Sequence, residues 1–319
     1  MRCAVCGSTD VRPHLRVAGE AGSEGLIPTT DRFGTALSDI VRCGTCGHMQ
    51  LAIAPSSAEL NEAYAEAASD DYLNEEAGQR ATARTILDRI EAHRSGGALL
   101  DLGCWVGFLL HESEGRGWRA TGVEPSEFAS AYARDRLGLD VHTAELFAVE
   151  FGAGAFDAVV MADVIEHLPE PGAALARARS LLGPGGVLAL TLPDAGSWLA
   201  RLLGRRWWSV IPTHVHYFTR SSIARLLEST GFDVVAIETA PKAFTVRYYL
   251  GRVGGYSRRA ARALNRIASA AGIADRLWAP DFRDRMLVIA RTEHRGESDQ
   301  QPPATQATAD RRVDLDHVV

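Results

Sequence analysis

The chain has 319 residues, of which 46% are hydrophobic and 23% are charged, and its formal net charge is −6. This composition is ordinary for a globular enzyme, and the negative charge argues against a nucleic-acid binder, which normally has a basic surplus. The first residues lack the apolar stretch of a signal peptide, and no later apolar run approaches the length of a membrane span. We therefore expect a cytoplasmic protein, in which thiols stay reduced.

Two copies of one short cysteine motif lie near the N-terminus. Cys3 and Cys6 form the first Cys-x-x-Cys pair, Cys43 and Cys46 form the second, and a glycine follows each pair. Four thiolates suit the tetrahedral coordination of Zn²⁺, and a complete set of four leaves no open position for chemistry. The spacing therefore predicts a small structural zinc-binding ribbon over residues 1–54, and it disfavours a redox dithiol.

A helical segment is predicted over residues 55–95. Alanine, glutamate and leucine recur there at helical spacing, and two glycines end the pattern at positions 96 and 97. We interpret this segment as a lid or linker. Tyr64 and Tyr72 within it are candidates either for covering a bound cofactor or for plain helix packing.

From residue 98 onward, short apolar runs alternate with amphipathic stretches, which is typical of a parallel α/β sheet. The pattern predicts seven strands, at 98–103, 119–124, 139–142, 156–162, 186–192, 232–239 and 286–291. Four helices are predicted between them, at 106–116, 126–137, 171–182 and 219–230. We expect a cofactor-binding domain over 96–241, which contains all but the last strand.

The last quarter of the chain differs in composition. Residues 242–294 should form a basic helical insert followed by the final strand, and the polar, proline-bearing residues 295–319 should form a disordered tail. Arginines dominate the charged residues of the insert. They could form a solvated helix face, or a contact surface for phosphate or for membrane headgroups.

A loop after the first predicted strand has the features of a cofactor site. Asp101 ends the strand, Gly103 and Gly107 lead into a helix, and Glu124 ends the second strand, where a carboxylate can accept hydrogen bonds from ribose hydroxyls. The Gly-x-x-x-Gly spacing lacks the tight pyrophosphate turn, and Asp101 would repel a pyrophosphate. These two details disfavour a nicotinamide cofactor and suit S-adenosylmethionine, which carries an ammonium, a sulfonium and no phosphate.

Five motifs follow one another in order, at residues 101–107, 122–125, 143–145, 156–169 and 182–186. They resemble the motifs of class I S-adenosylmethionine-dependent methyltransferases. The resemblance covers residues 98–240 and the final strand. It implies an α/β, Rossmann-like methyltransferase sheet of seven strands, mostly parallel with one antiparallel edge strand, preceded here by the small zinc ribbon.

The resemblance also implies roles for individual residues in binding S-adenosyl-L-methionine. The residues near the methionine end would be Asp101, Gly103 and Asp163, and the backbone of Cys104 and Gly107 would form the loop. The carboxylate of Glu124 would bind the ribose. Ala144 and Glu145 would lie beside the adenine. The family usually has glycine where this chain has Trp105. The backbone of Trp105 must therefore avoid the left-handed region or bear strain.

Segment 207–219 is dense in aromatic and imidazole rings and follows the fifth strand, where this family lines its acceptor pocket. Transfer of a methyl group to a hydroxyl requires removal of a proton, for which histidine is the usual base. The segment resembles the His-x-x-(Tyr/Phe)-Phe-(Ser/Thr) stretch of sugar methyltransferases, with His214 at the base position. His216 and His167 are the alternative bases, and Tyr217 and Phe218 are expected to be core residues.

The zinc ribbon ahead of this domain resembles a narrower group, the zinc-binding sugar methyltransferases of deoxysugar and polysaccharide pathways. We therefore expect an enzyme that methylates a hydroxyl of a sugar or glycan. Its acceptor would be a small molecule or a glycan, and the basic insert hints at a phosphate-linked or lipid-linked one. Nucleic acid is not the expected partner.

Three alternatives remain open at this point. The first is carbon methylation of a deoxysugar, although such enzymes usually carry a larger C-terminal domain. The second is RNA base methylation, because some ribosomal RNA methyltransferases begin with a zinc ribbon. The net charge opposes it, and so does the sequence Asp163-Val-Ile-Glu166, which stands in place of an Asn-Pro-Pro-Tyr-like motif. The third is a non-catalytic interaction protein, which Trp105 alone favours.

Overall fold

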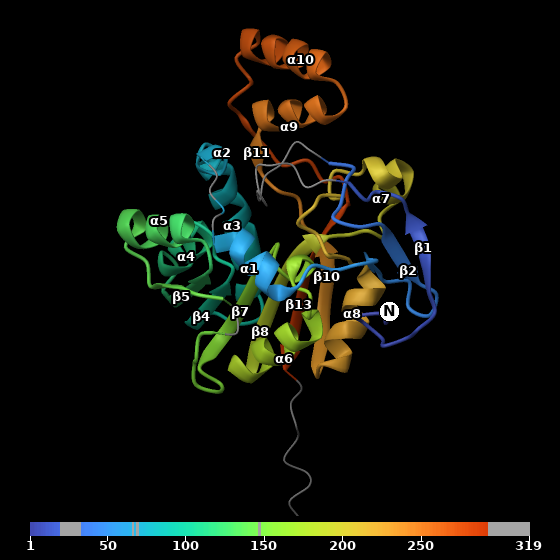
Figure 1. Cartoon of the computed structure of the whole chain (residues 1–319). Helices are drawn as coiled ribbons and strands as arrows, with labels where there is room; N and C mark the ends of the chain where they lie inside the picture. Colours follow the sequence, from blue (N-terminus) through green and yellow to red (C-terminus); the bar gives the residue numbers. More distant parts are fainter. Residues whose placement is uncertain (20–32, 66, 68–69, 146–147, 293–319) are drawn as a thin grey trace, which may run out of the picture.

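The computed structural model describes residues 1–19, 33–65, 67, 70–145 and 148–292 (Figure 1). The tail expected over 295–319 lies outside the described residues. In the part of the chain that is described, no helix is both long and apolar enough to cross a bilayer.

A seven-stranded sheet occupies the centre of the fold. Its strands are β4 (Gly97–Leu102), β5 (Trp118–Glu124), β6 (Val141–Thr143), β7 (Phe156–Ala162), β8 (Leu182–Pro193), β10 (Phe232–Thr239) and β13 (Arg285–Thr292). They lie in the order β10-β13-β8-β7-β4-β5-β6, and β13 alone runs antiparallel to its neighbours. The predicted α/β sheet of seven strands is therefore confirmed, and its antiparallel strand lies beside the outermost strand, β10.

Helices cover both faces of this sheet. They are α3 (Glu76–Glu91), α4 (Phe108–Glu114), α5 (Glu127–Leu137), α6 (Pro171–Leu181) and α8 (Arg220–Ser229). Successive strand residues point to opposite faces, so Leu99 packs with α3, α4 and α5, whereas Leu100 packs with α6 and α8. Each face therefore has its own apolar core, which explains why the strands are almost continuously hydrophobic.

The structure adds detail to two of the predicted segments. The helical segment predicted over 55–95 contains the helices α1 (Ser57–Ala65), α2 (Asp70–Leu73) and α3. Residues 183–186 belong to β8, which begins at Leu182 directly after α6 ends. This strand therefore begins four residues before its predicted start at residue 186.

The N-terminal ribbon is completed by a strand from the centre of the chain. Its own strands are β1 (Val11–Leu15), β2 (Ile40–Cys43) and β3 (Met49–Leu51), and the fourth is β9 (His216–Tyr217). Met49 pairs with Tyr217 in an antiparallel register. Cys3 and Cys43 also belong to the apolar core that contains Phe218. Residues 1–54 therefore do not form a closed unit, since segment 216–218 supplies part of their sheet and core.

Two helices occupy the predicted basic insert. The short strands β11 (Phe244–Thr245) and β12 (Leu277–Trp278) pair at its base, and between them lie α9 (Val246–Arg252), the 3-10 turn η3 (Val253–Gly255) and α10 (Arg258–Ala270). Thr245 and Ser257 cap the two helices by accepting a hydrogen bond from a backbone amide of the first turn. Figure 1 shows α9 and α10 projecting from the rest of the molecule, at the top of the view.

Candidate functional site

A cavity of about 930 Å³ opens at the carboxyl ends of the central strands. Gly103 follows β4, Glu124 ends β5 and Asp163 follows β7, and all three line the cavity. Ligands of open α/β sheets bind at this edge, where neighbouring strands leave a crevice. Tyr64 of α1 and Tyr72 of α2 also line the cavity, so both tyrosines face it and neither serves helix packing alone.

The loop after β4 is held in a left-handed conformation. Gly103 has φ 77, and a Cβ atom at this position would lie 2.6 Å from Cγ2 of Val164, so the position requires glycine. Trp105 has φ 49, which is the strained alternative of the two foreseen from the sequence. Its backbone amide donates a hydrogen bond of 2.8 Å to Glu124, and its ring lies edge-on to Tyr72. These contacts hold the strained loop in place.

Three of the expected loop residues lie outside the cavity lining. Asp101, Cys104 and Gly107 are not among the described residues that line it, whereas Gly103 is. Asp101 is buried, and burial together with the nearby Glu124 raises its pKa to about 8. A Cβ atom on Gly107 would lie 2.5 Å from Leu139, so this glycine permits close packing of the loop against the core. The three residues therefore support the loop on its side away from the cavity.

Glu124 faces the cavity at the end of β5. One carboxylate oxygen accepts a hydrogen bond from the amide of Trp105 and the other accepts one from the amide of Ser126, both at 2.8 Å. Each oxygen retains a free lone pair that could accept a ribose hydroxyl. Burial raises the pKa of Glu124 to about 7, even though both amides favour its ionised form. Ala144 and Glu145 line the cavity nearby, just after β6.

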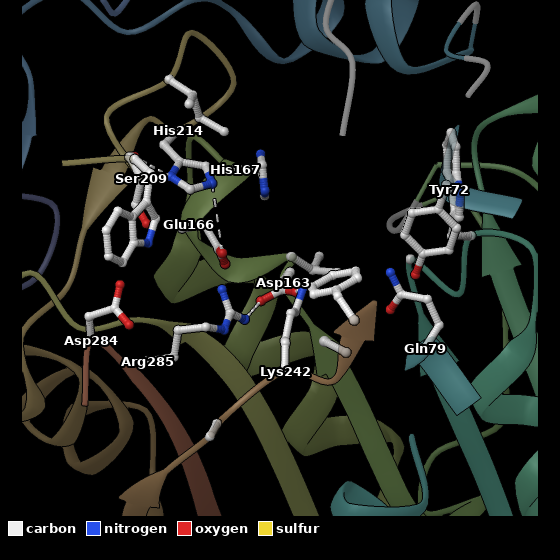
Figure 2. Close-up of a pocket in the computed structure, with 18 of the residues that line it drawn as sticks. Tyr72, Gln79, Asp163, Glu166, His167, Ser209, His214, Lys242, Asp284 and Arg285 are labelled. Atoms are coloured by element: carbon white, nitrogen blue, oxygen red, sulfur yellow. Dashed lines mark hydrogen bonds and ion pairs between the residues drawn. The ribbon is translucent and has the colours of Figure 1, made fainter. Parts of the chain in front are cut away.

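Asp163 is bound by two cationic side chains that the sequence did not indicate as its partners. It has φ 60 and forms ion pairs with Lys242 and Arg285 inside the cavity (Figure 2). Burial opposes its ionisation, but Arg285 and Lys242 hold the pKa of Asp163 well below its usual range. The cations lie 79 and 122 residues further along the chain (242 − 163 and 285 − 163). Only the tertiary fold brings them to this carboxylate.

His214 lies in the cavity wall opposite Tyr72 and Gln79 (Figure 2). Its Nδ1 is 2.8 Å from the carbonyl oxygen of Ser209, which can only accept, so Nδ1 carries the proton of the neutral ring. The unprotonated Nε2 is 4.0 Å from a carboxylate oxygen of Glu166. Burial, aided by the neighbouring His167, lowers the pKa of His214 well below its usual value. The ring is therefore neutral, with one nitrogen free to accept a proton.

His167 lines the same cavity, at the end of the 3-10 turn η1 (Ile165–His167). Its Nδ1 lies 2.6 Å from the hydroxyl oxygen of Tyr64 and 2.9 Å from the carbonyl oxygen of Thr213. Its ring centroid is 4.7 Å from that of His214, in an edge-on arrangement. Burial lowers the pKa of His167 to about 4. The structure thus brings two of the three predicted histidines together.

Glu166 is a site residue that sequence reasoning left out of its candidates. Its side chain is buried, and within the described part of the chain neither carboxylate oxygen has a hydrogen-bond partner. Burial, and then the charge of Asp163, raise its pKa to about 8. Its donor atoms and those of His167 and His214 lie within 4.8 Å of one another. This group could relay a proton or hold a divalent cation.

His216 is not among the described residues that line the cavity. It is buried in β9, with Nδ1 3.1 Å from Nε2 of His48 and Nε2 3.3 Å from the carbonyl oxygen of Pro169. One ring nitrogen therefore contacts the ribbon, and the other contacts the segment that follows η1. His216 thus lies apart from the cavity that His214 and His167 line, and its role as an alternative base stays a prediction. Tyr217 and Phe218 are buried, as expected of core residues.

Aromatic rings line the part of the cavity next to His214. Trp208 lies 5.6 Å from Phe282, and Tyr249 of α9 lies 5.4 Å from Trp278, measured between ring centroids. Trp208 and the basic insert thus supply one aromatic wall together. Flat rings of this kind stack well on ring-shaped ligands.

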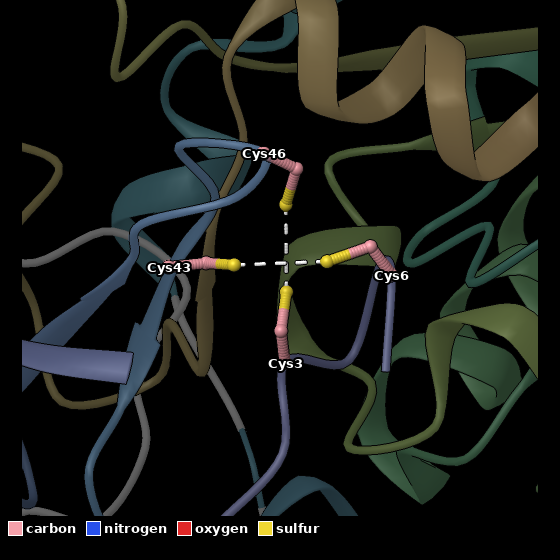
Figure 3. Close-up of side chains that lie close together, drawn as sticks. All are labelled: Cys3, Cys6, Cys43 and Cys46. Carbon is pink, nitrogen blue, oxygen red and sulfur yellow. Dashed lines mark hydrogen bonds between the residues drawn. The ribbon is translucent and has the colours of Figure 1, made fainter. Parts of the chain in front are cut away.

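The four paired cysteines converge on one point (Figure 3). The sulfur of Cys3 is 3.5 Å from that of Cys46, and the sulfur of Cys6 is 3.6 Å from that of Cys43. A tetrahedral Zn²⁺ with Zn–S bonds of about 2.3 Å has sulfur–sulfur edges of about 3.8 Å. The donor set and its geometry therefore fit a zinc ion with little adjustment.

Comparison with known sequences gives a family match. The family described as "Methyltransferase domain" matches residues 75–237, about half of the chain. The ubiquinone biosynthesis O-methyltransferase of Aromatoleum aromaticum is 29% identical over 165 residues, which cover 47% of this chain and 70% of that protein. The enzyme of the same name from Caulobacter vibrioides is 38% identical over 120 residues, or 34% of this chain and 47% of that one.

Among solved structures, the magnesium protoporphyrin IX methyltransferase of Synechocystis superposes with a TM-score of 0.44 and 15% identity. The superposition covers 68% of this chain and 81% of that one.

Proposed function

Because this chain belongs to the family of S-adenosylmethionine-dependent methyltransferase domains, we propose that it methylates a hydroxyl oxygen of a small-molecule acceptor, with His214 as the general base. The donor supplies a methyl group already activated by its sulfonium. His214 would take the hydroxyl proton on Nε2 while the acceptor oxygen forms a bond to the methyl carbon and the carbon–sulfur bond breaks. The products would be a methyl ether and S-adenosylhomocysteine.

The observation that carries this proposal is the state of His214. The Ser209 carbonyl holds the proton on Nδ1, and burial keeps the ring neutral, so Nε2 is ready to accept a proton inside the cavity. A positioned base of this kind contributes about 10²–10⁴ in rate. His167 has a similar arrangement, because its Nδ1 lies against the carbonyl oxygen of Thr213, so it is the alternative base. We assign His167 to orienting the site because its Nδ1 also contacts the hydroxyl of Tyr64.

The cofactor would lie along the tips of β4, β5 and β7. Glu124 would hold the ribose hydroxyls, Ala144 and Glu145 would contact adenine, and Asp163 would face the ammonium group. The support for this placement is that all four residues line one cavity, with Gly103 between them. Tyr72 and the strained Trp105 would cover the cofactor from the side of α2, and so exclude water from the sulfonium.

The aromatic wall beside His214 supports a ring-shaped acceptor, and we propose a sugar or glycan hydroxyl as the first candidate. A phenolic hydroxyl is the second candidate, because the relatives named above are ubiquinone biosynthesis O-methyltransferases. A screen of neutral sugars, nucleotide sugars and catechols, with methylated products located by mass spectrometry and NMR, separates the two. A product methylated on carbon, or on RNA and lost after ribonuclease treatment, would contradict the proposal.

We further propose that Cys3, Cys6, Cys43 and Cys46 bind one structural Zn²⁺. The fit of the four sulfurs supports this, and so does the small number of large apolar residues in the ribbon itself. The zinc would fix the ribbon against β9. Since β9 begins two residues after His214, the ion would also help to hold the catalytic segment in place.

Replacing Lys242 by methionine should tighten the binding of S-adenosylmethionine. Lys242 occupies one carboxylate oxygen of Asp163 and Arg285 occupies the other, so the cofactor ammonium has to compete with two cations. Removing one adjacent unit charge should lower Kd by about tenfold. Isothermal titration calorimetry measures the change. Arg247→Met, at an exposed ion pair on α9, serves as the matched control and should leave Kd unchanged.

Weaker cofactor binding by Lys242→Met would show that Lys242 orients Asp163 for the ammonium group. The competition described above would then be wrong.

A further inference from the structure

The basic insert has a charge bias, and the arginines of α10 take no part in the chemistry proposed above. From Thr239 to Ala274 the sequence contains Lys242 and six arginines but no aspartate or glutamate, although the whole chain has a net charge of −6. Four of these arginines lie on α10 and are exposed, namely Arg258, Arg259, Arg262 and Arg266. At 100° per residue they fall within one side of the helix. This side is solvent-facing and strongly cationic.

A second side of α10 is apolar and also exposed. Ala261 and Ala268 are the buried positions of this helix, which packs mainly against α9 and η3. Ile267 is 66% exposed and Leu264 is 38% exposed, so the apolar side extends well beyond that contact. Two large side chains near β12, Ile273 and Leu277, are exposed as well. The helix thus presents an apolar stripe bordered by arginines, which is the pattern of an interfacial helix.

The hairpin that carries α10 also forms part of the cavity wall. Tyr249, Tyr256, Trp278 and Phe282 line the cavity, and the last three are also substantially exposed. The cavity and the apolar stripe therefore share one structural element, the segment from β11 to β12. Figure 1 shows this segment projecting from the sheet, with its two helices clear of α6 and α8. Tyr256, between the two helices, packs on Phe33.

We propose that the α9–α10 hairpin docks the protein on an anionic lipid bilayer. Leu264 and Ile267 enter the boundary between headgroups and acyl chains, and the four arginines of α10 bind lipid phosphates. An acceptor held in the bilayer then reaches the cavity along the aromatic side chains of the hairpin. Each cation near an anionic membrane surface contributes to binding, and apolar insertion adds to it.

Charge and apolarity together favour a lipid surface over other partners. In an isologous dimer over this face, the arginines of α10 would lie opposite the same arginines of the second copy. A nucleic acid would satisfy the arginines but would leave Leu264 and Ile267 exposed to water. The net negative charge of the whole chain, combined with this cationic hairpin, would orient the protein with the hairpin toward an anionic surface.

The test is flotation of the full chain with vesicles of phosphatidylcholine, with and without phosphatidylglycerol. We expect binding to the anionic vesicles, weakened at least tenfold by Leu264→Asp combined with Ile267→Asp, and weakened similarly by Arg258→Gln combined with Arg262→Gln. Leu202→Asp is the matched control, because Leu202 is 71% exposed but lies on α7 (Trp198–Leu203). Its binding should equal that of the wild type. Unchanged affinity for S-adenosylmethionine shows that each variant is folded.

Three results would overturn the proposal. In flotation, these are wild-type protein that does not bind the anionic vesicles at low salt, and hairpin variants that bind them as well as the wild type does. In analytical ultracentrifugation, the third result is a wild-type dimer that the hairpin variants lose. The last would assign the hairpin to a contact between two copies of this chain. The flotation measurement involves no methyl transfer, so its outcome is independent of the function proposed above.

Discussion

Replacing His214 by alanine is expected to lower the rate of methyl transfer by about 10²–10⁴ while leaving the affinity for S-adenosylmethionine nearly unchanged. The variant loses the unprotonated Nε2 that faces the cavity, whereas the carboxylates assigned to the cofactor, Glu124 and Asp163, remain in place. Single-turnover quench experiments give the rate, and calorimetry gives the affinity. The two measurements together separate a missing base from a disrupted cofactor site.

Two further histidine variants sharpen this experiment. His142→Ala changes an exposed histidine on β6 and should keep the wild-type rate. His167→Asn should reduce the rate less than His214→Ala, because the role assigned to His167 is to orient the site together with Tyr64. If His167→Asn were the more damaging change, the assignments of the two residues would have to be exchanged.

Replacing Cys43 by serine is expected to remove the zinc and destabilise the whole protein. The loss of one thiolate leaves an incomplete metal site, and structural zinc contributes many kcal/mol to small domains. Cys43 also belongs to the core beneath α6 and α8, and the ribbon sheet includes β9. We therefore expect a loss of several kcal/mol, or about 10 °C in Tm, measured by calorimetry with zinc quantified by mass spectrometry.

The fifth cysteine provides the control for this variant. Cys104 is buried in the loop after β4, far in sequence from both Cys-x-x-Cys pairs, so Cys104→Ala should keep one zinc per chain. Wild-type protein purified without zinc, or a Cys43→Ser variant with unchanged Tm, would contradict a structural metal in the ribbon.

The sequence predicted the central fold well because its signals are local. Strands β7 and β10 begin and end at the predicted residues. The apolar run of β7 is buried, whereas β10 is an outer strand that is only partly covered. The cysteine motif likewise contains its own geometry, since a short turn brings two sulfurs together. The strain at Trp105 could also be predicted from a local signal, because a left-handed backbone disfavours any residue with a Cβ atom.

The features that the sequence did not predict depend on contacts between distant segments. The pairing of Asp163 with Lys242 and Arg285 arises because the insert and β13 return to the cavity after the rest of the sheet is complete. The diversion of His216 into the ribbon arises from its pairing with Gln50. Neither contact leaves a periodic pattern, so the sequence favoured His214 by resemblance but could not show that His216 lies apart from the other two histidines.

The ratio of single-turnover rates of the wild type and His214→Ala, measured against pH, tests the central claim most directly. His214 has its pKa well below the usual value, so its free nitrogen accepts protons throughout the range from about pH 7 to pH 9. In the variant, hydroxide from solution would have to remove the acceptor proton, and its concentration rises tenfold per pH unit. The rate of the variant should rise accordingly, so the ratio of wild-type rate to variant rate should fall by about tenfold per pH unit. Titrating groups that lie away from His214 are the same in both proteins and cancel in the ratio. A ratio that stays constant with pH would contradict His214 as the proton acceptor.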